Sequence, residues 1–213
     1  MLQQMDASDT SSGVIKFLEW LRKNNIQVEN GIELGCGKGR NVIGLALQGI
    51  KMTGIDFSEV AIKEAKRRAK DERVDKITNF VVHDATLKWP FDSNSFDIAI
   101  DCFATTDIET EKGRKFAAKE IKRALKRGGY LVVYTLSTDD EFHKEMIEKS
   151  PSKEKNAFYH PTTGKFEKTF EREELLNLYK GLKLIEEARV EKTTTFFGKE
   201  YYCKHHWMIF KKK

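Results

Sequence analysis

A glycine-rich turn behind a short apolar stretch is the feature that most constrains the fold of this 213-residue chain. Residues 32–41 are IELGCGKGRN, so glycines occupy alternate positions directly after Leu34, and an amphipathic segment over 42–47 follows. A strand, a glycine turn and a helix in this order bring backbone N–H groups and a helix N-terminus close to a nucleotide-like ligand. Glycine suits such a turn because a Cβ would block both the backbone torsions and the close approach.

The spacing of these glycines distinguishes the turn from a dinucleotide site. Gly35, Gly37 and Gly39 form G-x-G-x-G, whereas dinucleotide-binding turns have G-x-G-x-x-G. Glu33 precedes the first glycine by two positions, where its charge would repel a pyrophosphate and attract an ammonium or a sugar hydroxyl. A nicotinamide-dependent dehydrogenase is therefore the least favoured of the enzyme classes that use such a turn.

Strands and helices alternate through the next hundred residues. The pattern predicts strands over 51–56, 78–82, 96–100 and 130–136, and helices over 58–73 and 111–127. The second helix is expected to end at a glycine cap, Gly128-Gly129. Such alternation predicts a parallel, doubly wound sheet with right-handed crossovers. Ligands of these sheets bind at the carboxyl ends of the strands, where this chain places Glu33, Asp56, Asp84 and Asp101.

The last third of the chain departs from this alternation. Residues 182–190 and 201–210 are predicted strands joined through 196–198 without a helix, so they must pair antiparallel. Further helices are expected over 13–23, 139–149 and 171–179, with a turn over 159–165. We expect a single domain with three parts: an N-terminal helical cap (1–27), a cofactor-binding core (28–136), and an acceptor-side insertion with the C-terminal strands (137–213).

Composition and charge exclude several classes of protein. The 38 basic and 33 acidic residues are interleaved and leave a net charge of +5, which permits a nucleic-acid partner but does not indicate one. No apolar run approaches the roughly 18 residues of a membrane span, and residues 1–12 lack the layout of a signal peptide. Three cysteines do not form a disulfide framework. We therefore predict a cytoplasmic protein with no membrane association.

Residues 30–211 together resemble the class I S-adenosylmethionine-dependent methyltransferases, with Glu33 and the Gly35–Gly39 turn as motif I. The resemblance implies a Rossmann-like, doubly wound, mostly parallel seven-stranded α/β sheet with an antiparallel C-terminal hairpin and helices on both faces. It also implies S-adenosylmethionine as the cofactor and S-adenosylhomocysteine as the product. The antiparallel end of the sheet is not what a dehydrogenase resembles.

The resemblance assigns contacts to each end of the cofactor. Glu33 and the glycine turn would hold the methionine portion, and Asp56 would accept both ribose hydroxyls in charge-assisted bonds. Asp84 would take the adenine amino group, and Asp101 would lie beside the sulfonium. The predicted cofactor-binding residues are Glu33, Gly35, Cys36, Gly37, Gly39, Asp56, Phe57, Asp84, Ala85 and Asp101. The structural alternatives are a helix cap or loop anchor for the acids and a hydrophobic staple with Ile62 for Phe57.

The segment that follows the fourth core strand bears on the acceptor. Residues 101–104, DCFA, lack the Asn/Asp-Pro-Pro-Tyr/Phe motif and the proline-cysteine pair found in two nucleic-acid methyltransferase classes. This favours a small-molecule acceptor, and the closing segments loosely resemble the tellurite-resistance and ubiquinone-biosynthesis branches. The sulfonium methyl is already activated, so a base is needed only for an acceptor proton of high pKa. The catalytic group is therefore left open, with His160, His205, Tyr134 and Asp107 as candidates, and Tyr159 and His206 as further pocket residues.

Three alternatives stay open at this point. An RNA or protein methyltransferase could use the same cofactor site and dock through the lysine tail, 211–213. A non-catalytic cofactor-binding protein would show the same motifs. Cys36, Cys102 and Cys203 could form a thiol site for a metalloid, although free cysteine is usually a small buried hydrophobe. No His/Cys set has zinc-ligand spacing, so no metal is predicted, and the acceptor and the oligomeric state are undetermined.

Overall fold

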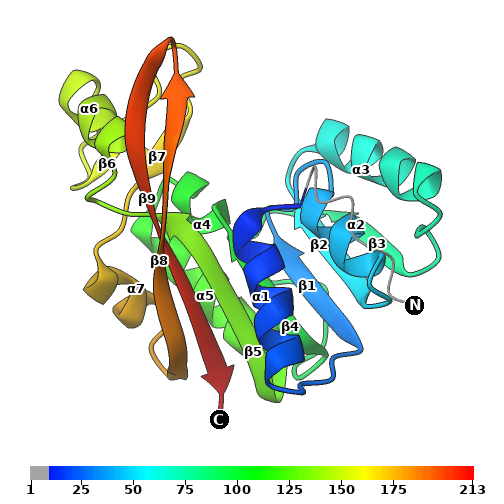
Figure 1. The fold of residues 1–213 in the computed structure, drawn as a ribbon. Helices are drawn as coiled ribbons and strands as arrows, with labels where there is room; N and C mark the ends of the chain where they lie inside the picture. Colours follow the sequence, from blue (N-terminus) through cyan, green and yellow to red (C-terminus); the bar gives the residue numbers. More distant parts are fainter. Residues whose placement is uncertain (1–9) are drawn as a thin grey trace.

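The computed structural model describes residues 10–213 and is built on a seven-stranded sheet with helices on both faces (Figure 1). In sheet order the strands are β3 (Thr78–Val82), β2 (Lys51–Asp56), β1 (Asn30–Leu34), β4 (Phe96–Cys102), β5 (Leu125–Leu136), β9 (Lys199–Lys212) and β8 (Leu182–Phe196). The first five pair parallel, and β9 pairs antiparallel with both β5 and β8. The expected mostly parallel sheet with an antiparallel C-terminal hairpin is confirmed.

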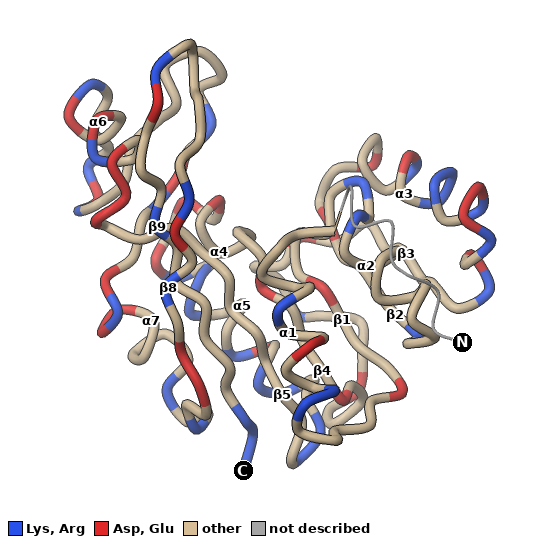
Figure 2. Tube along the Cα trace, viewed as in Figure 1, with Lys and Arg blue, Asp and Glu red and all other residues tan. Residues whose placement is uncertain are grey.

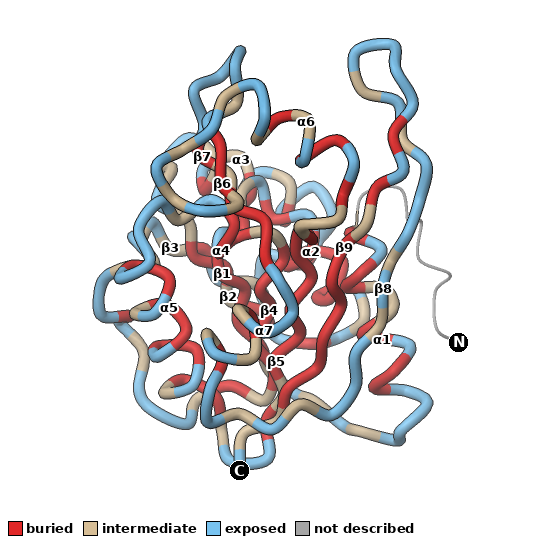
Figure 3. The backbone as a smooth tube through the Cα atoms, turned by 90° about the vertical axis from the view of Figure 1, so that its left-hand side faces the viewer, coloured by how far each residue is buried: buried red, intermediate tan, exposed pale blue. Residues whose placement is uncertain are grey.

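The helices divide into two groups that bury different faces of the sheet. Seven helices are present in the described chain: α1 (Ser12–Lys23), α2 (Arg40–Ala46), α3 (Glu59–Asp71), α4 (Ala104–Asp107), α5 (Glu111–Ala124), α6 (Glu141–Lys149) and α7 (Arg172–Leu178). Apolar side chains of α1, α2 and α3 share one core cluster, and those of α5 and α7 share another. Figure 3 shows the buried strands between these layers. The sheet is therefore doubly wound, as alternation along the chain predicts.

Apolar runs and a capping residue predict the strands and the helix that follow the glycine turn. The predicted bounds of β2 and β3 agree with the structure. Ser58 is the N-cap of α3, and its hydroxyl accepts a hydrogen bond from the Ala61 N–H at 3.2 Å. Ile62, Ala65 and Ala69 form the buried face of that helix. The two alanines let the helix approach the sheet closely, because their side chains are small.

The predicted end of α5 is wrong. The helix stops at Ala124, and the chain is already extended at Leu125, which pairs with Phe96 on β4. The expected glycine cap lies inside β5, where Gly128 has φ +79° and the pairing with β4 shifts register. Pairing with β4 therefore outweighs the helix-ending signal of the two glycines, and the left-handed glycine serves a bulge instead.

The C-terminal hairpin is longer than predicted and supports a small lobe. β8 and β9 pair along nearly their whole length, with one shift of register between Leu184 and Glu186, and extend past the other strands (Figure 1). A third apolar cluster packs the far end of this hairpin against α6. A two-stranded hairpin of β6 (Ala157–Tyr159) and β7 (Phe166–Lys168), which the sequence did not indicate, completes the lobe. The expected turn over 159–165 is the connection of this hairpin.

The N-terminal helix packs against the sheet. The Trp207 indole N–H donates to the Gly13 carbonyl at 2.8 Å, and the Trp20 indole N–H donates to Glu186 at 2.6 Å. Phe17 and Leu21 are buried on the same helix. The predicted cap begins at residue 1, and residues 1–9 lie outside the described part of the chain. The division of the domain into three parts stays a prediction.

Basic and acidic residues are interspersed along the chain (Figure 2). The exposed face of α3 illustrates this, because Arg67 bonds to Glu64 and Asp71 one turn away on either side. Within residues 10–213, no helix combines the length and the apolar character that crossing a membrane requires.

Candidate functional site

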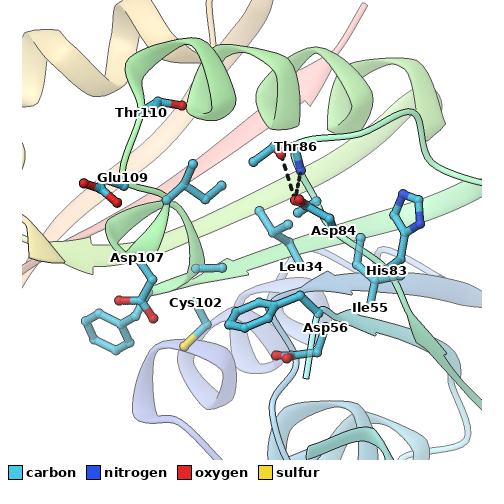
Figure 4. A pocket seen from close by; sticks show the side chains of 16 residues that line it. Leu34, Ile55, Asp56, His83, Asp84, Thr86, Cys102, Asp107, Glu109 and Thr110 are labelled. Carbon is cyan, nitrogen blue, oxygen red and sulfur yellow. Dashed lines mark hydrogen bonds between the residues drawn. The ribbon is translucent and has the colours of Figure 1, made fainter. Parts of the chain in front are cut away.

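Two adjoining cavities open at the carboxyl ends of β1, β2, β3 and β4. The larger has a volume of about 440 Å³ and is lined from all four strand ends (Figure 4). The smaller has a volume of about 290 Å³ and surrounds the glycine turn. Gly35 and Cys102 line both cavities. The two cavities therefore adjoin at these two residues.

The glycine turn leaves open space beside its backbone. Gly37 has φ +53°, and a Cβ built there would meet nothing within 4 Å. Gly39 has φ +78°, and its Cβ would lie 2.8 Å from the Phe80 ring. Gly39 is therefore required for packing as well as conformation, whereas Gly37 borders the cavity where a ligand can approach the main chain.

Glu33 is a buried carboxyl that is only half satisfied. Its side chain is 2% exposed, and Oε1 accepts a hydrogen bond from Asn41 Nδ2 at 2.6 Å. No partner among the described residues bonds to Oε2. Burial raises the pKa of Glu33 to about 8, against the lowering effect of Asn41. This oxygen is therefore available to an ammonium of a bound ligand, which would favour the ionised carboxylate.

Basic side chains line the same small cavity as Glu33. Lys38, Arg40 and Arg68 contribute to its wall, and the Arg68 guanidinium also donates to the Lys38 carbonyl at 3.2 Å. A carboxylate and several cations around one small space match a zwitterion, with an ammonium toward Glu33 and a carboxylate toward the basic residues. The smaller cavity therefore fits the amino-acid end of S-adenosylmethionine.

Asp56 and Asp84 enter the larger cavity from the ends of β2 and β3. Asp56 accepts from the Gly37 N–H at 2.8 Å and the Ser58 N–H at 2.9 Å, which fixes the glycine turn to β2. Asp84 accepts from the backbone N–H and the hydroxyl of Thr86, both at 2.8 Å (dashed in Figure 4). A carboxylate has about four acceptor positions, so each keeps capacity for ligand hydroxyl or amino groups.

The other residues at this end of the cavity have different positions. Phe57 lines the rim with 79% of its surface exposed, so the alternative of a packed staple with Ile62 is not supported. Ala85 lines the cavity, and its carbonyl accepts from the Trp89 indole. His83 was not among the predicted residues, yet it lines the cavity, and its buried Nε2 has no hydrogen-bond partner among the described residues. The position of His83 beside Asp84, at the end of a predicted strand, is the sequence signal that could have identified it as a cavity residue.

The structure gives Asp101 a different role from the predicted one. Its carboxylate is fully buried and lines neither cavity. It accepts from the N–H groups of Ala104 and Thr105, from the Thr105 hydroxyl, and from the Tyr179 hydroxyl. Burial raises the pKa of Asp101, and these hydrogen bonds oppose the rise. Asp101 therefore anchors the turn that carries Cys102 and Phe103 to the cavity wall, and its own carboxylate does not reach either cavity.

Tyr134 and His205 form a buried pair behind that wall. The Tyr134 hydroxyl and His205 Nδ1 are 3.0 Å apart, and the Phe103 ring centroid lies 4.8 Å from Tyr134 and 5.2 Å from His205. Neither residue lines either cavity. Burial lowers the pKa of His205 to about 4 and raises the pKa of Tyr134. A histidine that is neutral at pH 7 and separated from the cavity by Phe103 is a packed core residue rather than a placed base.

Asp107 is the one catalytic candidate that lines the larger cavity. It forms an ion pair of 2.7 Å with Lys165 in the connection between β6 and β7. Tyr159, on the same hairpin, donates its hydroxyl to Glu109 at the cavity edge. His160 lies in that connection but does not line the cavity. His206 is buried, with Nε2 2.9 Å from the Phe170 carbonyl oxygen.

The three cysteines do not assemble into a thiol site. Cys36 and Cys102 line the smaller cavity, but Cys203 belongs to the apolar cluster beneath α6. Burial raises the pKa of both Cys36 and Cys102, the latter to about 11, so both are protonated at pH 7. Among residues 10–213 there is no group of three or more His, Cys, Asp or Glu side chains placed to hold a metal ion.

Comparison with known families identifies the fold and its cofactor. A sequence model described as a methyltransferase domain matches residues 27–187, which is most of the chain. The chain belongs to this methyltransferase family. The strand order agrees with a class I S-adenosylmethionine-dependent methyltransferase domain, because β9 lies next to the edge of the sheet and runs antiparallel to both of its neighbours.

Curated relatives of this methyltransferase domain act on different molecules. A demethylmenaquinone methyltransferase from Clavibacter sepedonicus is 37% identical over 112 residues, which are 52% of this chain and 42% of that protein. The sterol 4-C-methyltransferase strm-1 from Caenorhabditis elegans is 26% identical over 54% of this chain and 33% of that protein. The chain thus spans less than half the length of these relatives.

Solved structures cover the chain more completely. An S-adenosylmethionine-dependent methyltransferase from Methanosarcina mazei superposes with a TM-score of 0.78 at 25% identity, over 90% of this chain and 96% of that one. TehB from Haemophilus influenzae superposes with a TM-score of 0.68 at 20% identity, over 95% of this chain and 62% of that one. The second likeness shows a shared fold.

The residues of this methyltransferase domain fit S-adenosylmethionine. The unpaired Oε2 of Glu33 matches an ammonium, and the open space beside Gly37 admits a ligand against the main chain. Asp56 and Asp84 present carboxylate oxygens to the larger cavity, where ribose and adenine would lie. Two of these observations support the cofactor independently of the family assignment. They are the Glu33 oxygen without a partner among the described residues and the open space beside Gly37.

Proposed function

We propose that this protein transfers a methyl group from S-adenosylmethionine to a small molecule. The observation that carries the proposal is that the two cavities lie side by side and share Gly35 and Cys102 in their walls. One end suits the amino-acid portion, and Asp56 and Asp84 suit the adenosine. The segment of Asp107, Ile108 and Glu109 then forms a wall of the larger cavity with no assigned cofactor contact. This wall is free to hold an acceptor next to the transferred methyl.

Each acidic residue has a binding or positioning role in this proposal. When bound, S-adenosylmethionine supplies a methyl group that its sulfonium charge already activates. Glu33 would orient the ammonium, Asp56 the ribose, and Asp84 the adenine amino group. Asp101 holds the turn that places Cys102 and Phe103 on the cavity wall. Holding two reactants in line can by itself lower a barrier by several kcal/mol, so positioning is the main contribution of these side chains.

Three observations support a small acceptor over a macromolecule. The β6–β7 hairpin contacts both Asp107 and Glu109, so part of the acceptor side is covered. No Lys or Arg is among the described residues that line the larger cavity, whereas nucleic-acid sites are basic. The two curated relatives are named for menaquinone and sterol acceptors. An RNA or protein acceptor is the first alternative, and a non-catalytic cofactor-binding protein is the second.

Calorimetric titration tests the cofactor site directly. We expect S-adenosylmethionine and S-adenosylhomocysteine to bind, NAD to give no heat, and Asp56→Ala to weaken binding by about 1–3 kcal/mol. Asp75→Ala removes an exposed carboxylate between α3 and β3 and serves as the matched control. Binding of NAD alone, or equal affinity of the two variants, would contradict the proposed site.

The class of acceptor is tested with a radioactive methyl donor. Extracts separated into small-molecule, RNA and protein fractions would be incubated with the enzyme and S-adenosylmethionine labelled in the methyl group. We expect label to enter the small-molecule fraction. Label confined to RNA or protein would favour the first alternative. Tight cofactor binding with no transfer to any fraction would favour the second.

A further inference from the structure

The larger cavity has an unusual charge for a site that must hold two ligands. Four carboxylates line it, from Asp56, Asp84, Asp107 and Glu109. No Lys or Arg is among its described lining residues, and the undescribed segment 1–9 contains neither residue type. An anionic acceptor would therefore enter a cavity of like charge, which opposes binding.

The four carboxylates separate into two pairs. Asp56 and Asp84 come from the ends of β2 and β3, on the side that the proposed function gives to adenosine. Asp107 and Glu109 come from the segment after β4, on the other side of the cavity (Figure 4). The proposed function gives the second pair no contact with the cofactor, so we assign its charge to the acceptor.

The structure already places an ammonium on Asp107. Lys165 Nζ lies 2.7 Å from Asp107 Oδ2, and its side chain is 52% exposed, so this ammonium can leave for solvent. Lys165 is also 3.7 Å from Glu167, which can retain it. The Asp107 carboxylate therefore accepts an ammonium in a geometry that an incoming ligand could reproduce.

An aromatic residue lines the cavity together with these carboxylates. Phe103 lines the cavity and adopts φ +61°, a left-handed conformation that is costly for a bulky residue. Its N–H donates to the Tyr134 carbonyl at 2.9 Å, and the Asp101 bonds to Ala104 and Thr105 hold the following turn. Strain of this kind persists where the surroundings enforce it, and it clusters at functional sites. Ring faces attract cations, including alkylammonium groups.

We infer that the acceptor is an amine, with Asp107 and Glu109 as the residues that select it. This inference rests on the proposed function, because it assumes that adenosine occupies the other side of the cavity. The ammonium form would dock on Asp107, with Glu109 adding negative charge and Phe103 an aromatic face. Loss of one proton from the docked ammonium, to Asp107 or to water, frees the nitrogen lone pair. That pair forms the new N–C bond while the C–S bond breaks and its electrons stay on sulfur, and the product is a methylated ammonium.

The ionisation of Asp107 is compatible with this role. Burial raises its pKa to about 6, against the lowering effect of Lys165, and the charges of Glu167 and Asp101 contribute to the rise. At pH 7 the carboxylate is mostly ionised and can bind an ammonium, and its pKa is close enough to neutrality for it to take up a proton.

The test is a comparison of head-group charge on the protein saturated with S-adenosylhomocysteine. The probes are matched amines, alcohols and carboxylates on phenylethyl, cyclohexylethyl and butyl scaffolds, with affinity measured by saturation-transfer NMR. We expect the amines to bind about tenfold or more tighter than the matched alcohols and carboxylates. The double variant Asp107→Asn/Glu109→Gln should lose this preference. The matched control, Asp75→Asn/Glu72→Gln, changes two exposed acids away from the cavity and should keep it.

Lys165→Met separates the inference from its main competitor. If Lys165 is only the resident counterion of Asp107, its removal leaves amine binding intact or strengthens it. If Lys165 anchors an anionic acceptor, the variant loses binding of the carboxylate probes. Equal affinities for the three head groups, a preference for carboxylates, no binding of amines, or an amine preference that survives Asp107→Asn/Glu109→Gln would each overturn the inference. Calorimetry with S-adenosylhomocysteine on the same samples distinguishes these results from failure of the cofactor site itself.

Discussion

The variant Glu33→Gln tests whether burial raises the pKa of the Glu33 carboxyl, the group to which we assign the ammonium of the cofactor. Burial raises the pKa of Glu33 from its ordinary value of 4.5 to about 8. A raised pKa means that the folded state is favoured below pH 4.5 and loses this advantage as the pH rises toward 8, because the unfolded chain ionises first. The shift corresponds to about 5 kcal/mol of unfolding free energy over that interval, which is comparable with the total stability of many domains.

Urea denaturation between pH 5 and 8 measures this effect. We expect the unfolding free energy of the wild type to fall with rising pH more steeply than that of Glu33→Gln, which has the same size and cannot ionise. Asp101 and Asp107 also have raised pKa values, so the difference between the two proteins, rather than either slope alone, isolates Glu33. Parallel slopes would refute the reasoning.

Cofactor binding should release a proton from the same group. About nine-tenths of Glu33 is protonated at pH 7 when its pKa is about 8, and an ammonium at Oε2 favours the ionised form. Binding of S-adenosylhomocysteine should therefore release about 0.8 of a proton, after allowance for uptake by the ligand's amino group. Calorimetry in buffers of different ionisation enthalpy measures this number. Two controls should release none: Glu33→Gln, and 5′-methylthioadenosine, which lacks the amino-acid portion. Release that is the same with both ligands would assign the proton to another group.

Two further predictions concern the turn and the buried pair. Gly37 and Gly49 both have positive φ and open space for a Cβ, so alanine at either should cost about 1–2 kcal/mol of unfolding free energy; only Gly37→Ala should weaken binding of S-adenosylhomocysteine in calorimetry. Tyr134→Phe removes the bond to His205 and should lower the unfolding free energy by about 1 kcal/mol without changing turnover, because neither residue is among the described residues that line the two cavities of the site. Equal loss of cofactor binding in the two glycine variants, or a large fall in turnover with Tyr134→Phe, would contradict these expectations.

The sequence was sufficient for the parts of the fold that local signals determine. The end of β2 at Asp56 and the start of α3 after Ser58 follow from an apolar run and a capping residue, and both agree with the structure. The antiparallel pairing of β8 and β9 followed from the absence of a helix between them. These features depend on residues close in the chain, which is why periodicity and caps predict them well.

The misplaced features depend on partners that are remote in sequence. Leu125 is extended because it pairs with Phe96, and no local pattern near the two glycines of 128–129 indicates that pairing. The β6–β7 hairpin has strands of three residues each, too short to show alternation. The ion pair between Lys165 and Asp107 depends on this hairpin. The sequence alone therefore could not predict that the two side chains meet.

The two acids at the ends of β1 and β4 show why a strand-end carboxylate alone does not identify a ligand contact. The chain after Asp101 turns at once into a short helix, and the N–H groups of Ala104 and Thr105 bond to the carboxylate. The chain after Glu33 instead enters a glycine turn, and no backbone N–H bond to its Oε2 is formed within the described residues. The discriminating property is therefore what the following backbone can donate. The N–H groups three and four residues after Asp101 satisfy that acid internally. Glu33 is stabilised from further along the chain, by Asn41 and the Val42 N–H, and its Oε2 keeps no partner among the described residues.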